Sequence, residues 1–245
     1  MQPTIIEDQI SVAAGAINDN VIVSNASLRG LLNAPYPSRI RLLAVSSAAG
    51  LRIDATHGSS KYLDSSDVRV AAFAEDPFDL VNGDAYCQAQ EQMVIRASNT
   101  TGGALTLAYR LILMPMVDDS WDGNPIELPP DTVVTQRLQS IAAAAVDTQL
   151  LDGLTFQQIA EPVILRALMS ASATGLTRQL FIDQDRIAPP SAVSTSNRMP
   201  QDPMDTTIDG VEVGPNAQQF LSVSNPTGGA LTMRWKVKAQ KLIRT

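Results

Sequence analysis

The chain is poor in the residues that form disulfides, metal centres and catalytic groups. Its 245 residues include one cysteine, Cys87, and one histidine, His57. A lone cysteine cannot form an internal disulfide, and a lone histidine cannot build a metal centre that needs several imidazole ligands. The G-x-S-x-G motif that positions a serine nucleophile is also missing. The sequence therefore predicts a protein that is not an enzyme and that holds no cofactor.

Aromatic residues, long apolar runs and positive charge are scarce as well. Aromatic residues make up 4% of the chain, and the formal net charge is −7. An acidic chain lacks the broad basic surface that nucleic-acid binding requires. No apolar run approaches the roughly 20 residues of a transmembrane helix, and no basic stretch followed by an apolar one opens the sequence. We therefore expect neither a membrane span nor a signal peptide.

The most informative feature that is present is an internal repeat. Ser98–Thr106 reads SNTTGGALT and Ser224–Thr232 reads SNPTGGALT, so only the third residue differs. The two copies begin 126 residues apart, which is the size of a domain. Chance recurrence of Gly-Gly turns is the alternative, but weaker matches follow in the same order. These pair residues 9–17 with 139–146, 46–51 with 170–176, and 76–79 with 202–205.

The repeat predicts two copies of one fold. Each copy is expected to be all-β, because short runs rich in Val, Ile, Leu and Thr alternate with Gly, Asn, Asp, Ser and Pro. Eight strands in about 110 residues suit a sandwich or barrel. The expected organisation is an N-terminal arm at 1–7, a first domain at 8–116, a linker at 117–136 and a second domain at 137–245.

The expected strands of the first copy include eight segments, and two short helices are expected in equivalent connections. Residues 138–146 have helical propensity, but their partner in the repeat is strand-like, so we predict a strand there as well. The strands are expected at 9–15, 20–24, 39–47, 51–56, 67–73, 84–90, 92–98 and 104–114, and the helices at 27–33 and 155–161.

The repeated nonapeptide is expected to close a hairpin between the last two strands of each copy. Asn99 can bond its own backbone, and Gly102 and Gly103 can take positive φ without steric cost. Neither copy is followed by the lysine and helix start of a phosphate-binding loop, which argues for a structural turn. The equivalent residues of the second copy are Asn225, Gly228 and Gly229.

Two further groups of residues are candidate sites. Asp118, Ser120 and Asp122 have the spacing that opens a calcium loop, but Pro129 stands where its glutamate belongs, so a solvated linker is the alternative. His57 follows a strand and precedes Gly58, which predicts an exposed loop residue.

The last strand carries the one basic patch. Arg234, Lys236 and Lys238 alternate with apolar residues, which predicts a cationic face on a strand. The equivalent face of the first copy is largely apolar. We interpret the cationic face as surface charge or as a contact with acidic neighbours or phosphates.

Two acidic, tandem eight-stranded sandwiches with almost no histidine or cysteine resemble the double jelly-roll major capsid proteins of icosahedral, membrane-containing viruses such as tectiviruses and corticoviruses. The resemblance covers the whole chain and rests on the duplicated hairpin and the strand count. It implies two jelly rolls, a homotrimer with a pseudo-hexagonal outline, and a virion location after synthesis in the host cytoplasm. The chain, at 245 residues, has little room for the tall loops that many relatives carry.

The partners implied by the resemblance are further copies of the chain, neighbouring capsomers and other virion proteins, with a lipid membrane or the genome on the inner face. The alternative is a virion spike, a fibre or a carbohydrate-binding tandem module. A sugar-binding surface uses clustered aromatic side chains, whereas Trp121 and Trp235 are the only tryptophans and lie far apart in the sequence.

Overall fold

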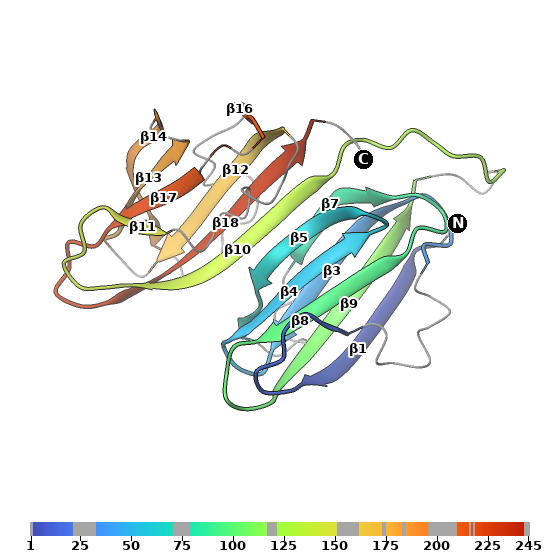
Figure 1. Ribbon diagram of the computed structural model, residues 1–245, viewed down its shortest axis with the longest axis horizontal. Coiled ribbons are helices and arrows are strands. Elements are labelled where there is room, and N and C mark those ends of the chain that lie inside the picture. Colours follow the sequence, from blue (N-terminus) through green and yellow to red (C-terminus); the bar gives the residue numbers. More distant parts are fainter. Residues whose placement is uncertain are drawn as a thin grey trace. The chain divides into compact units, whose positions relative to one another are not determined.

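A computed structural model describes residues 2–21, 33–70, 79–116, 122–150, 162–172, 175–182, 185–195, 210–215, 217 and 219–242. The secondary structure of these residues is entirely β (Figure 1). None of them forms a helix able to cross a membrane. The chain divides into two compact units, Met1–Val134 with Arg244–Thr245, and Thr135–Ile243.

The first unit is a sandwich of two antiparallel sheets. One sheet has the order β1-β9-β3, with β7 pairing the far side of β3, and the other has the order β2-β8-β4-β5. Its strands are β1 (Thr4–Val12), β2 (Asp19–Asn20), β3 (Ser38–Ser46), β4 (Leu51–His57), β5 (Ser60–Asp67), β6 (Arg69–Val70), β7 (Asp79–Cys87), β8 (Met93–Asn99) and β9 (Leu105–Pro115).

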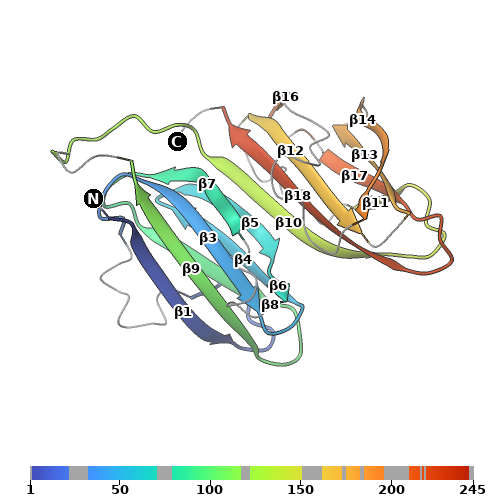
Figure 2. The same cartoon turned by 180° about the vertical axis from the view of Figure 1, so that it is seen from behind.

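This strand order is that of a jelly roll. Apart from the two-residue β6, consecutive strands pass from one sheet to the other, except that β4 and β5 form a hairpin. The last two strands, β8 and β9, each insert between earlier ones. Two interlocked Greek keys give this connectivity. Figure 2 shows β1, β9 and β3 side by side from the opposite direction.

The core of the first unit follows from the alternation along its central strands. In β9, Leu107, Tyr109, Leu111 and Leu113 are fully buried, and the residues between them are partly exposed. Successive side chains of a strand point to opposite faces, so one face of β9 lines the space between the sheets. The burial of large apolar side chains of this kind provides the main favourable term in folding.

The second unit repeats the topology of the first. Its sheets have the orders β10-β18-β12-β16 and β11-β17-β13-β14. Even the short parallel strand recurs, since β6 pairs with β3 and β15 pairs with β12. The strands are β10 (Thr132–Ile141), β11 (Thr148–Leu150), β12 (Val163–Ser172), β13 (Thr177–Ile182), β14 (Asp185–Ala192), β15 (Ser194–Thr195), β16 (Val211–Val213), β17 (Gln219–Ser224) and β18 (Leu231–Lys241).

The prediction of two all-β jelly rolls is therefore confirmed, and several strand bounds differ from the expected ones. β1 begins at Thr4, inside the segment expected as an arm, and β10 begins at Thr132, inside the segment expected as a linker. Thr4–Val12 pairs with β9 along its whole length, and for this reason β1 begins before residue 9, where the strand was predicted to start.

One predicted strand was misplaced because its sequence is polar. Ser60–Asp67 forms β5 instead of the expected strand at 67–73, of which only Arg69–Val70 is seen as β6 among the described residues. Its polar side chains are buried by long-range contacts, with Asp64 3% exposed and Ser66 fully buried. The helices expected at 27–33 and 155–161 lie outside the described residues, apart from Asn33, which forms an isolated bridge with Gln92.

The prediction that residues 138–146 avoid a helix is correct for the strand that reaches Ile141. After Ile141 the chain turns, and Ala144 takes a φ of 53°. The chain turns in the same way in the first unit, where β1 ends at Val12 and Gly15 has a φ of 67°. The two connections therefore turn at equivalent places.

Candidate functional site

The repeated hairpin is organised by a buried asparagine. Asn99 is 2% exposed. Its Oδ1 accepts hydrogen bonds from the Thr101 backbone at 2.9 Å and from Thr101 Oγ1 at 2.8 Å. Its Nδ2 donates to the Gly103 carbonyl at 2.8 Å and to the Val12 carbonyl at 3.1 Å. One side chain thus closes the turn and ties it to the end of β1.

The second unit has the same arrangement. Asn225 is fully buried, accepts from the backbone and hydroxyl of Thr227, and donates to the Gly229 carbonyl at 2.9 Å. Its Nδ2 also donates to the Ala142 carbonyl at 2.8 Å, where the chain leaves β10. The prediction that the asparagines organise these turns agrees with this geometry.

The paired glycines lie in the turns, as predicted, but they do not take the positive φ expected of them. Positive φ occurs at Gly15 and Gly50 but not at Gly102, Gly103 or their equivalents Gly228 and Gly229. A Cβ added at any of these four positions would meet nothing within 4 Å. The turn closes through the asparagine side chain, which leaves the glycine backbone in ordinary conformations.

The nonapeptide also joins two neighbouring loops. Ser98 Oγ accepts from the Asn18 backbone at 2.9 Å, and Ser224 Oγ accepts from the Asp147 backbone at the same distance. Gly50, with a φ of 113°, sits beneath Thr101, and its carbonyl accepts from the Thr100 backbone at 2.9 Å. The serine contact therefore occurs in both units, whereas the backbone contact with Gly50 is made in the first, since Pro226 stands in place of Thr100 in the second.

We expect Asn225→Ala to lower the free energy of unfolding of the second unit by about 2–3 kcal/mol, because buried backbone carbonyls lose their donor. The fluorescence of the buried Trp235 during urea denaturation measures this. Asn99→Ala is the matched control, since it removes the equivalent contacts in the first unit. An Asn225→Ala transition that coincides with wild type would contradict the assigned role.

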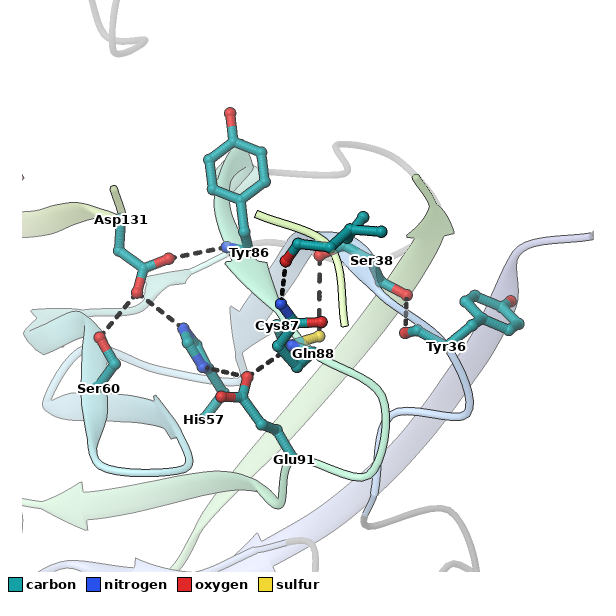
Figure 3. A network of polar contacts seen from close by, with 10 residues as sticks. Tyr36, Ser38, His57, Ser60, Tyr86, Cys87, Gln88, Glu91 and Asp131 are labelled. Carbon is teal, nitrogen blue, oxygen red and sulfur yellow. Dashed lines mark hydrogen bonds and ion pairs between the residues drawn. The ribbon is translucent and has the colours of Figure 1, made fainter. Parts of the chain in front are cut away.

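The described residues also contain a polar cluster around the single histidine, which the sequence did not predict. His57 ends β4 and is 2% exposed, so the expectation of an exposed loop residue is wrong. Its Nδ1 lies 3.0 Å from Glu91 Oε2, and its Nε2 lies 2.9 Å from Asp131 Oδ2 (Figure 3). Its ring stacks on that of Tyr62, with centroids 5.8 Å apart.

Asp131 is the most heavily bonded member of this cluster. Its Oδ2 accepts from Ser60 Oγ at 2.7 Å as well as from His57, and its Oδ1 accepts from the Tyr86 backbone at 2.9 Å. Burial acts to raise the pKa of Asp131, but hydrogen bonds from His57, Ser60 and Tyr86 and the charge of His57 outweigh it, so the pKa lies below its usual value.

Glu91 connects the histidine to the chain that leaves the first unit. Its Oε2 accepts from the Gln88 backbone at 2.7 Å, and the Gln88 side chain donates to the Ile126 carbonyl. Residues 122–131, called the linker segment below, belong to the first unit and are bonded to its strands and their connections at Ile126 and at Asp131. Sequence reasoning missed this because His57 lies 34 residues from Glu91 and 74 from Asp131.

Two other titratable side chains lie beside the cluster. Tyr62 is fully buried, and burial raises its pKa above the usual value, with smaller contributions from Cys87 and Asp131. Cys87 is a buried thiol whose Sγ lies 3.8 Å from the Ser38 carbonyl. Ser60 donates to Asp131 and not to His57, so the cluster does not have the serine–histidine order of a nucleophilic triad.

The predicted cationic face is less exposed than its sequence suggests. Lys236 and Lys238 are only 6% and 7% exposed, and Arg234 is partly exposed. The alternating residues Met233, Trp235 and Val237 are buried as predicted, and Trp235 Nε1 donates to Gln139 Oε1 at 2.7 Å. Both faces of this strand are thus largely removed from solvent.

The calcium candidate is described only in part. Asp118 and Ser120 lie outside the described residues. Asp122 is exposed, and its carboxylate accepts from the backbone and side chain of Asn124. Within the described ranges, no group of three or more His, Cys, Asp or Glu side chains is arranged to hold a metal ion.

Comparison with known proteins gives little at the level of sequence. No known family matches the chain, and no curated protein matches it significantly. Among solved structures, a chain from the atomic structure of Sulfolobus turreted icosahedral virus is similar over 97% of this chain and 91% of its own length. The two share 11% identity with a TM-score of 0.41.

Proposed function

We propose that the chain is a structural coat protein of an icosahedral virion, and specifically its major capsid protein. The observation that carries the proposal is the duplication: two units with one jelly-roll connectivity, down to the short parallel strand, follow each other in a single chain. A repeated block of this kind is suited to tiling, because each chain supplies two similar building units.

The chemistry of the described residues supports a structural role over an enzymatic one. His57, the one histidine, is buried between two carboxylates, and Ser60 is bonded to one of them. General acid–base catalysis needs a side chain within reach of a substrate. We therefore propose that the protein has no catalytic activity and requires no cofactor.

The finer proposal is that three chains form a trimer whose six jelly rolls give a pseudo-hexagonal capsomer. Its partners would be neighbouring capsomers and other virion proteins, with a membrane or the genome on the inner face. Neighbouring copies in such a capsomer would cover edge strands such as β1 and β14, which would otherwise be open to uncontrolled pairing.

Mass measurement tests the proposal. We expect native mass spectrometry to give three times the mass of the 26.2 kDa chain, and electron micrographs to show hexagonal capsomers or closed shells. A monomer at every concentration and salt condition, with no particles, would overturn it.

The alternative is a virion spike, a fibre or a carbohydrate-binding module. Trp235, one of the two tryptophans, is fully buried and is therefore removed from any sugar-stacking surface. Selective binding to a glycan array by a stable monomer would favour this alternative over the coat protein.

A further inference from the structure

The linker segment is bonded to the first unit through two arms that meet at His57. The first arm is direct, from His57 Nε2 to Asp131. The second runs from His57 Nδ1 to Glu91, and from Glu91 through Gln88 to the Ile126 carbonyl. A single buried imidazole therefore takes part in both attachments of this segment.

The donors and acceptors around His57 determine which protonation state of its ring can make both contacts, with Glu91 and with Asp131. Both imidazole nitrogens face carboxylate oxygens, and a neutral imidazole has only one N–H to donate. Both carboxylates also accept hydrogen bonds from other donors, Asp131 from Ser60 and Glu91 from the Gln88 backbone, so each presents an acceptor oxygen to the ring. The arrangement is complete only when His57 is an imidazolium.

We propose that His57 is a proton-operated latch that holds the linker segment to the first unit at both points when charged and releases the Glu91 arm when neutral. The two arms differ in what remains once the proton is lost. Asp131 keeps Ser60 and the Tyr86 backbone as donors, and its side chain is 2% exposed. Among the described residues, Glu91 keeps the Gln88 backbone as its one other donor, and its side chain is 31% exposed, so water can solvate it as it moves away.

Loss of the His57–Glu91 contact affects the linker segment through Gln88. The Gln88 backbone loses its acceptor, and the Gln88 side chain is then no longer held against the Ile126 carbonyl. Asp131 remains the fixed point. The neutral state therefore frees the segment upstream of Asp131 without detaching the start of β10.

The other titratable groups around the ring are on neighbouring elements. Tyr62 of β5 stacks on the imidazole, Cys87 of β7 lies next to Tyr62, and Glu91 and Asp131 come from the β7–β8 connection and the linker segment. Burial raises the pKa of Tyr62 above its usual range, so Tyr62 stays neutral throughout the pH range of interest.

The wild-type protein provides the first test. Because the chain has one histidine, a single imidazole Cε1–H resonance can be followed from pH 6 to 9.5 without ambiguity. Amide hydrogen exchange, corrected for its intrinsic pH dependence, is measured on the same samples. We expect protection of the Gln88 amide to fall by about tenfold with the midpoint of the His57 titration, since a hydrogen bond to a charged group is lost. The Tyr86 amide, bonded to Asp131, should keep its protection.

Variants separate the latch from general unfolding. His57→Gln should remove the pH step at Gln88, and Glu91→Ala should leave the Gln88 amide weakly protected at every pH, because the side-chain acceptor is gone. Glu127→Gln is the matched control, because Glu127 is an exposed acid of the same segment, and its step should match wild type.

Three results would overturn the proposal. They are an imidazole that keeps its proton through pH 9.5, a Gln88 amide whose protection has no step at the His57 midpoint, and a Tyr86 amide that opens together with it. All three results come from the unmodified protein, so they hold even where a variant fails to fold.

Discussion

Replacing Asp131 with asparagine should lower the free energy of unfolding of the first unit by about 3 kcal/mol at neutral pH. Breaking a buried ion pair by removing one partner is costly because the other charge stays buried. Three donors converge on the two carboxylate oxygens, from His57, Ser60 and the Tyr86 backbone. The asparagine amide group can accept through one oxygen only, so at least one of these donors meets an NH₂ group.

Asp131→Asn should also change how the free energy of unfolding depends on pH under acidic conditions. The pKa of Asp131 is lowered in the folded protein, so its contribution is complete above the ordinary value of 3.8 and is lost as pH falls through the folded pKa. The difference between wild type and Asp131→Asn should therefore shrink as pH falls below about 4. Urea denaturation followed by circular dichroism at several pH values measures it.

Asp122→Asn is the matched control for this experiment. Asp122 belongs to the same linker segment but is exposed, and its carboxylate accepts hydrogen bonds from the backbone and side chain of Asn124. We expect its effect to stay within about 0.5 kcal/mol. Equal effects at Asp122 and Asp131 would show that the buried cluster contributes nothing specific.

Gly50→Ala should destabilise the first unit by a similar amount, about 3 kcal/mol. Gly50 has a φ of 113°, which an L side chain rarely adopts, and its added Cβ would lie 2.4 Å from Thr101 Cγ2. Backbone strain and overpacking each cost about 1–3 kcal/mol. Adding Thr101→Ser removes the methyl group and should recover the steric part of the loss but not the backbone part.

Gly102→Ala is the control that separates a required glycine from a repeated one. Gly102 has no positive φ and nothing within 4 Å of an added Cβ. The free energy of unfolding should stay within about 0.5 kcal/mol of wild type. Gly175→Ala should be intermediate, since its φ is 78° and the nearest atom, Thr227 Cγ2, is 3.2 Å away. Urea denaturation of the three variants in one buffer measures this order. A larger loss of unfolding free energy for Gly102→Ala than for the other two would contradict it.

The sequence predicts the local features of this fold better than its long-range ones. The repeated nonapeptide predicts two copies, and alternation predicts strands such as Leu51–His57. Ser60–Asp67 was missed because it is buried by long-range contacts, which its own polar sequence does not indicate.

The candidate site was missed for the same reason. His57 stands before Gly58 in a tight turn, which locally indicates exposure. Its burial depends on Glu91 and Asp131, which the fold brings together across 34 and 74 residues. The role of Gly102 was misjudged for a different reason, since the side chain of Asn99 closes the turn and leaves the glycine in an ordinary conformation.

The pairing of β1 with β9 has a mechanical consequence. Thr4 pairs with Leu113 and Val12 with Leu105, so the start of β1 and the end of β9 lie together. Tension applied through these two ends would open the pairs one after another, like a zipper, instead of loading all of them at once. The Tyr36 hydroxyl bonds the Gln2 carbonyl and Thr4 Oγ1 at the point where opening would begin. Resistance to a pull on these two ends therefore depends on one side chain at the entry more than on the length of the strand.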